Sequence, residues 1–291
     1  MTIQSKIDLM ARETRVRYGA VPHRLDDLPL AEQTWHIKSD QFLLRGMGSH
    51  WFYYRKGKGI VVERGQDADV TEEQLWLNGT LYSAIASLNG LMPLHASAVA
   101  FEGRVFAFAG LGGAGKSTLS AGLGRHGLPL FCDDTLVMDV SDPSQILCLP
   151  GHKRLKLTEQ ALELSGSARQ EKVSKTVDKF YALPPGGHFA RPLPLASLTF
   201  LEFGADLTFA PIRGGQALQL LEDNHYTSKL FSLVGVPDRA TRFELLSRFA
   251  QRIDVGLLTR PRDKMQFGGS VSFMADHIRH WKTRSISGTY V

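Results

Sequence analysis

The sequence predicts an α/β protein in two parts: a small α+β unit over residues 1–90 and a larger α/β unit over residues 91–291. Two observations lead to this division. Short aromatic and β-branched runs separated by glycines fill residues 35–62, which is typical of a small antiparallel meander. After Met92 and Pro93, strand-like runs alternate with helical stripes, which is typical of a layered α/β domain.

The composition is that of a packed protein. The chain has 291 residues, 43% of them hydrophobic, and 34 Lys plus Arg against 29 Asp plus Glu, which gives a net charge of +5. These values exclude a disordered or collagen-like chain, and the mild basic excess is compatible with an anionic ligand. Two cysteines, Cys132 and Cys148, are too few for a secreted disulfide framework.

Nothing in the sequence indicates a membrane or nucleic-acid partner. The first seventeen residues carry charges throughout, and no apolar run approaches the roughly 18–20 residues of a spanning helix. Trp35, Trp51 and Trp76 are predicted to be core aromatics of the small unit and not a platform for stacking bases. We therefore expect a cytoplasmic protein with no membrane and no nucleic-acid partner.

Within the small unit, residues 1–30 are predicted to be irregular because they are polar. Strands are expected over 35–62, followed by a helix that begins near Thr71, which has capping-box spacing with Gln74, and ends at Asn89 and Gly90. This unit shows no residue pattern typical of catalysis.

The larger unit is predicted to begin with a hairpin, residues 95–101 and 104–109, joined by Glu102 and Gly103. The elements expected after it are helix 116–126, strand 128–132, strand 146–149, helix 157–164, a loop over 183–194, strands 198–203 and 207–212, helix 239–251, strand 253–259 and helix 270–282. The alternation of strands and helices supports a sheet covered by helices.

A glycine-rich loop lies between the second hairpin strand and the following helix. It runs Gly110, Leu111, Gly112, Gly113, Ala114, Gly115, Lys116, Ser117 and Thr118, and thus fits G-x-x-x-x-G-K-[ST]. Glycines allow backbone N–H groups to turn around a phosphate, and the helix start adds its positive dipole. Lys116 would contact the β- and γ-phosphates, and the Ser117 hydroxyl would ligate Mg²⁺. The sequence predicts an ATP-Mg²⁺ site, and an ordinary glycine turn is the alternative.

Two adjacent acids, Asp133 and Asp134, follow the apolar strand 128–132. One helix separates this strand from the phosphate-loop strand, so a right-handed crossover makes the two strands parallel and brings both carboxyl ends to one edge. One carboxylate would then hold Mg²⁺ and the other would accept the proton of an attacking hydroxyl. Strand alternation favours Asp133 for the metal and Asp134 for the base. A polar turn is the alternative.

His95 is predicted to border the same loop. If Glu102 and Gly103 form a two-residue turn, paired positions sum to 205 and His95 lies opposite Gly110. Protonated, the imidazole could bond a phosphate oxygen; neutral, it could share a proton with an aspartate. A structural histidine at a strand start is the alternative.

Other cations are weaker candidates. Arg154 and Lys156 alternate with leucines, so both could contact ATP phosphates or an acidic acceptor, although a solvated basic edge is the commoner explanation. Lys172, Lys175 and Lys179 lie in a polar stretch for which a plain exposed loop is favoured over one that closes on nucleotide. No guanine-selective N-K-x-D motif is present.

These motifs together resemble those of a known protein family. The run from Leu94 to Ser97, the loop Gly110–Ser117 and the closing Asp133 and Asp134 resemble the catalytic core of HPr kinase/phosphorylase. The chain is more similar still to the HPr-kinase-like lasso peptide kinases, which share an accessory segment and a Pro-x-x-x-Arg-Leu-x-Leu strand like Pro150–Leu157. The resemblance covers residues 92–157 and implies a P-loop core of the HPr-kinase C-terminal, PEP-carboxykinase-like type.

The resemblance also implies an activity: an ATP- and Mg²⁺-dependent kinase that phosphorylates a serine hydroxyl of a peptide or protein, with a lasso precursor peptide and its C-terminal serine as the leading candidate. It implies roles for Lys116 and Ser117 with phosphate and metal, and for Asp133, Asp134 and His95 with proton transfer and metal. Thr118 stands where HPr kinases carry an acid, and no counterpart of their glycine-rich phosphorolysis signature follows the aspartates. A small-metabolite kinase and a non-catalytic nucleotide-binding regulator are the alternatives, and a homo-oligomer is left open.

Overall fold

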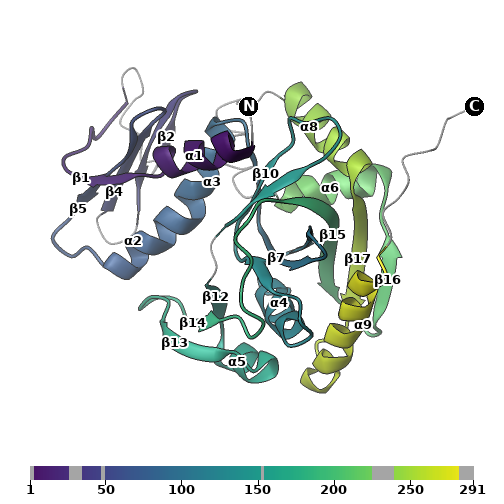
Figure 1. The fold of residues 1–291 in the computed structure, drawn as a ribbon. Coiled ribbons are helices and arrows are strands. Elements are labelled where there is room, and N and C mark those ends of the chain that lie inside the picture. The colour runs from purple at the N-terminus through teal and green to yellow at the C-terminus, as the bar shows by residue number, and fades with distance from the viewer. Residues whose placement is uncertain (1–2, 26–34, 47–49, 152–153, 225–238, 282–291) are drawn as a thin grey trace, which may run out of the picture.

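The computed structural model describes residues 3–25, 35–46, 50–151, 154–224 and 239–281. It is a mixed α/β structure with several sheets (Figure 1). A five-stranded sheet with its helices forms the N-terminal part, and a nine-stranded sheet forms the centre of the larger part. No helix in the described ranges has both the length and the apolar character needed to cross a bilayer.

The N-terminal sheet has the strand order β1-β5-β4-β3-β2. Its strands are β1 Val16–Tyr18, β2 Trp35–Ile37, β3 Gln41–Arg45, β4 His50–Arg55 and β5 Gly59–Arg64. β2 to β5 pair antiparallel in sequence order, so the predicted meander over 35–62 is confirmed. β1 adds a parallel strand beside β5.

The expectation that residues 1–30 are irregular is wrong for most of the described part. Helix α1 covers Ile3–Glu13, and β1 follows it directly. Met10 packs into the core of the N-terminal sheet. The buried Glu13 carboxylate accepts hydrogen bonds from the Tyr54 hydroxyl at 2.9 Å and the Gly57 amide at 2.8 Å. Polar composition concealed these few anchoring residues; positions 26–34 lie outside the described residues.

One nearly continuous helical segment follows: α2 Val70–Trp76, the π-helical turn η1 Leu77–Leu81 and α3 Tyr82–Leu88. Its N-cap is Asp69 and not Thr71, because the Asp69 carboxylate accepts the Thr71 amide at 2.8 Å. Asn89 ends the segment and Gly90 follows with φ 75°, as predicted.

The central sheet runs β6-β10-β11-β15-β8-β7-β9, with β17 beside β15 and β16 beside β17. Its strands are β6 Met92–Leu94, β7 Ala96–Phe101, β8 Arg104–Ala109, β9 Leu130–Cys132, β10 Leu136–Asp139, β11 Leu147–Leu149, β15 Leu193–Phe203, β16 Thr208–Pro211 and β17 Asp254–Arg260. The short strands β6 and β10 were not predicted.

The hairpin register is confirmed. Phe101 pairs with Arg104 and the ladder continues to Ala96 opposite Ala109, while Glu102 and Gly103 form the turn with φ of 43° and 72°. Strand β7 is antiparallel to both β8 and β9. Strands β8 and β9 are therefore parallel, as predicted, and their carboxyl ends lie at the same edge of the sheet.

Helices cover both faces of this sheet. α4 Lys116–Gly124 and α9 Phe267–Arg279, the latter preceded by the 3-10 turn η2 Lys264–Gln266, pack on one face. α8 Arg239–Arg252 packs on the other face together with α6 Gly214–Asn224, which was not predicted.

A third, three-stranded sheet has the order β12-β14-β13 and packs with α5 Glu159–Ser165 against α4. Its strands are β12 Leu155–Leu157, β13 Ala168–Lys172 and β14 Phe180–Leu183. The polar stretch expected to be a plain loop thus contains β13. The backbone of this strand pairs with β14, while most of its side chains face solvent.

Candidate active site

The glycine-rich loop leaves β8 and enters α4. Gly110 has φ 138°, and a Cβ there would come within 2.7 Å of the Leu201 carbonyl oxygen. Gly115 has φ 86°, and a Cβ there would collide with the Arg260 guanidinium. Both positions therefore require glycine, one because of the backbone of β15 and the other because of a buried arginine.

Lys116 lies at the centre of this loop. Its ammonium donates to the carbonyl oxygens of Gly110 at 2.8 Å and Leu111 at 3.3 Å, and the residue is 7% exposed. Burial lowers the pKa of Lys116, while the charges of Asp133 and Asp134 oppose that shift. The side chain is thus a preorganised point charge at the start of α4.

Asp133 follows β9 and is 1% exposed. Its Oδ1 accepts the Ser117 hydroxyl at 2.8 Å, and its Oδ2 accepts the Lys156 backbone amide at 3.2 Å. Burial, and then the charge of Asp134, raise the pKa of Asp133. The hydroxyl and carboxylate predicted to hold a metal are therefore in direct contact.

Asp134 adopts a left-handed conformation, with φ 71°. Its Oδ2 accepts from the Lys156 ammonium at 2.8 Å, and its Oδ1 lies 3.7 Å from Nδ1 of His95. Burial alone would raise the pKa of Asp134, but the charge and hydrogen bond of Lys156 outweigh it, so the pKa is lowered. Asp134 is therefore ionised at neutral pH.

His95 is held neutral. Burial and the nearby charge of Lys116 lower its pKa to about 4, although Asp134 opposes the shift. Of the two states considered from sequence, the uncharged imidazole beside an aspartate is the one that these surroundings favour.

These residues line one cavity of about 210 Å³. Its lining residues are His95, Gly112, Gly113, Gly115, Lys116, Ser117, Thr118, Asp133, Asp134, Lys156, Leu157, Thr158, Ala161 and Lys179. The strand ends, the glycine loop and the three-stranded sheet therefore contribute to a single site.

Of the remaining predicted residues, Gly110 and Ala114 support this cavity through their carbonyl groups, which accept from Lys116 and Arg260. Arg154 does not line it. Its guanidinium stacks 3.8 Å from the centre of the Tyr181 ring and bonds the side chains of Gln170, at 3.2 Å, and Glu171.

The sequence patterns gave two cations of this region only as weaker candidates and did not indicate a third. Lys156 was weighed as a solvated basic residue, yet its side chain is 13% exposed and pairs with Asp134. Lys179 was assigned to a plain loop, and Arg260, at the end of β17, was not considered. The alternation of Lys156 with leucines was a usable signal, whereas the position of Lys179 depends on strand pairing that no local pattern indicates.

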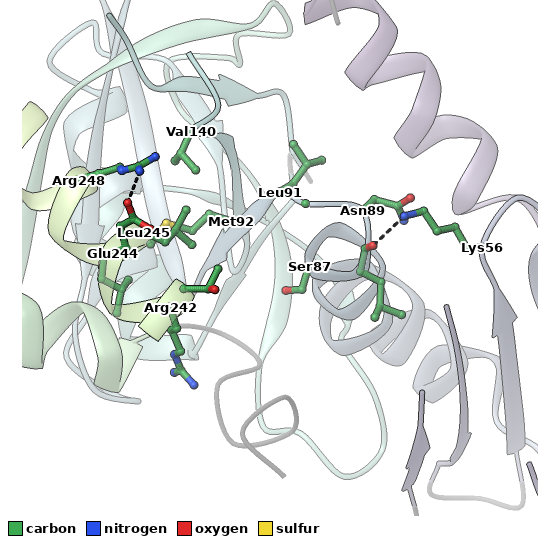
Figure 2. A pocket seen from close by; sticks show the side chains of 14 residues that line it. Lys56, Ser87, Asn89, Leu91, Met92, Val140, Arg242, Glu244, Leu245 and Arg248 are labelled. Atoms are coloured by element: carbon green, nitrogen blue, oxygen red, sulfur yellow. Dashed lines mark hydrogen bonds and ion pairs between the residues drawn. The ribbon is translucent and has the colours of Figure 1, made fainter. Parts of the chain in front are cut away.

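A larger cavity of about 500 Å³ lies between the end of α3 and α8, and none of the predicted site residues lines it (Figure 2). Two of its polar contacts lie within the lining: Lys56 donates to the Leu88 carbonyl at 3.3 Å, and Arg248 pairs with Glu244. A third cation of the lining, Arg242, pairs with Glu222 at 2.8 Å. This cavity offers no arrangement of reactive groups comparable to the one around Lys116.

Comparison with known proteins adds little to this geometry. No family model matches the chain, and no curated protein matches it. Among solved structures, the HPr(Ser) kinase/phosphatase from Coxiella burnetii is similar over 64% of this chain and 98% of its own, at 10% identity and a TM-score of 0.31. A likeness this weak carries no functional argument, so the function is argued from the site itself.

Proposed function

We propose that the cavity around Lys116 binds ATP with Mg²⁺ and transfers the γ-phosphoryl group to a serine hydroxyl of a peptide or protein. The observation that carries the proposal is the contact between the two motifs. Ser117, at the end of the glycine loop, donates to Asp133 at 2.8 Å, and Asp134 projects into the same cavity. A phosphate-binding loop beside a metal-binding acid and a second, ionised acid is the arrangement that phosphoryl transfer to an alcohol needs.

The donor set suits magnesium. The Ser117 hydroxyl and the Asp133 carboxylate are hard oxygen ligands, which Mg²⁺ prefers, and they already lie within hydrogen-bond distance of each other. These two residues would hold the ion, which when bound would neutralise charge on the phosphate oxygens.

The protein groups around it have distinct tasks. The loop amides and Lys116 bind and orient the phosphates at the start of α4. The Asp134 carboxylate accepts the proton of the acceptor hydroxyl, while Lys156 holds it ionised and directs one of its oxygens. Neutral His95 lies beside the other oxygen and limits its rotation.

A lasso precursor peptide, with its C-terminal serine as the phosphosite, is the specific substrate we propose. The sequence resemblance over residues 92–157 supports this choice. The site geometry supports the phosphoryl-transfer chemistry and is neutral as to which peptide supplies the hydroxyl.

The first test measures ADP formation and peptide mass with ATP-Mg²⁺ and a synthetic peptide ending in serine, beside the same peptide ending in alanine. We expect a mass gain of one phosphoryl group on the serine peptide alone. Lys116→Ala should weaken or abolish transfer without unfolding the chain. Lys58→Ala, which removes an exposed lysine outside the cavity, is the matched control. ADP formation only with small hydroxylated metabolites would indicate a metabolite kinase; nucleotide binding without turnover would indicate a regulator.

The second test separates the two acids. Asp134→Asn should lower kcat by about 10²–10⁴-fold, the contribution typical of a positioned base, and keep nucleotide affinity. Asp133→Asn should also weaken binding of ATP in the presence of Mg²⁺ but not in its absence, measured by calorimetry. Exchange of these two phenotypes would reverse the roles, and normal turnover in Asp134→Asn would exclude it as the base.

A further inference from the structure

The connection between β13 and β14, residues 173–179, brings Lys179 to the cavity around Lys116. The connection has internal order of its own. The backbone amide of the buried Val173 donates to the Lys179 carbonyl at 2.9 Å, and the Val177 amide donates to the Ser174 hydroxyl at 3.2 Å. Lys179 therefore enters the site from a folded turn, and its own side chain is exposed to the cavity.

Helix α2 of the N-terminal part holds the same turn from outside. The Thr176 hydroxyl donates to Oε1 of Glu72 at 2.5 Å, and Glu72 is only 6% exposed. A second, weaker contact joins Lys175, whose side chain is 89% exposed, to Asp69 at 3.5 Å. Figure 1 shows α2 lying beside the β13–β14 hairpin. The hydrogen bond to the buried Glu72 carboxyl group is the stronger of the two links, because an ion pair as exposed as that of Lys175 contributes little.

The same small sheet carries the cation that pairs with Asp134. β12 and β14 pair with Leu157 opposite Phe180. Lys156, on β12, and Lys179, directly before β14, therefore reach the cavity from adjacent positions of this sheet. Lys156 is committed to Asp134 at 2.8 Å, whereas Lys179 presents an exposed ammonium to the space beside Lys116. A tetra-anionic triphosphate in this space would find a second mobile cation there.

We propose that Lys179 is a further phosphate-binding residue of the site and that α2, through the bond from Thr176 to Glu72, is the element that positions it. Residues 1–90 would then contribute to catalysis, because α2 fixes the connection that places Lys179 in the cavity. The proposal rests on the proposed kinase function for its ligand, although the anchoring of the turn can be tested without turnover.

The first measurement is ATP-Mg²⁺ affinity and serine-peptide phosphorylation in the full chain. Lys179→Met should reduce kcat/KM by about 10–10²-fold, as expected for loss of a charged phosphate contact. Lys58→Met, which removes an exposed charge from the turn between β4 and β5, outside the cavity, is the control and should be unchanged. Equal behaviour of the two variants would overturn the role of Lys179.

The second measurement tests the anchor. Glu72→Ala should speed amide hydrogen exchange over residues 173–179 and lower kcat/KM about tenfold, at wild-type melting temperature. Glu72→Gln keeps an acceptor for the Thr176 hydroxyl, so it should restore most of the exchange protection and most of kcat/KM. Unchanged exchange in Glu72→Ala would overturn the anchoring. If the wild type transfers no phosphate, the proposed function fails while the exchange result still decides the anchor.

A double variant tests whether the anchor at Glu72 and the role of Lys179 depend on each other. If Glu72 acts through Lys179, the variant carrying both Glu72→Ala and Lys179→Met should be no slower than Lys179→Met alone. If the two losses multiply, Glu72 acts through another residue, and the proposed positioning is wrong.

Discussion

Replacing Lys156 by methionine should destabilise the protein and shift its pH dependence, because Lys156 is what keeps Asp134 ionised. The Lys156 ammonium lies 2.8 Å from Oδ2 of Asp134, with side chains 13% and 22% exposed. Lys156→Met removes this charge and the hydrogen bond while keeping a side chain of similar length.

The magnitude follows from the pair's burial. At an effective dielectric constant of about 20, two charges at this distance attract by about 6 kcal/mol, and desolvation of both groups offsets much of that. Breaking such a pair leaves Asp134 beside the charge of Asp133 without the cation that contacts its carboxylate directly, although Lys116 and Lys179 still lie nearby. Loss of a buried partner of this kind typically costs about 3–5 kcal/mol. Since Asp134 can relieve the cost by binding a proton, we expect a loss of about 2–3 kcal/mol at pH 7, or about 5–10 °C in Tm.

The pH dependence has a definite sign. In the wild type the lowered pKa of Asp134 contributes stability above its unfolded value, and this is lost as pH falls through the folded pKa. Without Lys156, less opposes the effect of burial, which raises the pKa of Asp134. The variant should therefore be most destabilised at high pH and approach the wild type as pH falls.

Thermal unfolding from pH 4 to 8 measures this difference, and the acid limb of kcat should move to higher pH in parallel. Lys172→Met, a surface lysine on the same small sheet, is the matched control. A stability difference between variant and wild type that stays constant across pH, or a kcat profile that does not move, would refute the coupling of Lys156 to Asp134.

Two further predictions concern buried side chains outside the reacting groups. Arg260→Lys should raise the KM for ATP several-fold and lower the free energy of unfolding by about 1–2 kcal/mol. The reason is that the planar Arg260 guanidinium donates to the Ala114 carbonyl at 2.9 Å and so fixes the glycine loop. Unchanged urea unfolding and KM would contradict this. Glu13→Gln should flatten the acid side of the stability profile. Burial raises the pKa of Glu13, but hydrogen bonds that include those from Arg12 and Tyr54 lower it overall. The stability that Glu13 contributes is therefore fully present above about pH 4.5 and is lost as pH falls through the lowered folded pKa. Identical acid unfolding curves would show that Glu13 is not responsible.

Much of the larger part could be predicted because its signals are local. The turn at Glu102 and Gly103 fixes the hairpin register, and that register with the apolar strand before Asp133 is enough to bring the glycine loop, His95 and both acids to one edge. Each step uses a short-range rule: turn type, strand pairing, or the hand of a crossover.

The small sheet and α1 could not be predicted in the same way. β13 is polar on both faces and is a strand because β14 pairs with it, a contact between segments rather than a property of either. α1 has a polar composition and is anchored by Met10 and by the Glu13 carboxylate, whose partners lie 41 and 44 residues away. Tertiary contacts override local propensity in both cases.

The order of the two acids shows where strand alternation stops being a guide. Alternation would point adjacent residues to opposite faces, yet the left-handed backbone at Asp134, with φ 71°, lets both carboxylates face one cavity. Such a conformation costs a non-glycine residue of order 1 kcal/mol and persists only where surrounding contacts hold it. The bonds from Lys156, by its amide to Asp133 and by its ammonium to Asp134, hold it here. One residue of the small sheet thus fixes both acids, with Asp133 buried against Ser117 and Asp134 facing the open side of the cavity. This separation would allow the two neighbouring carboxylates to take the different roles that we propose for them.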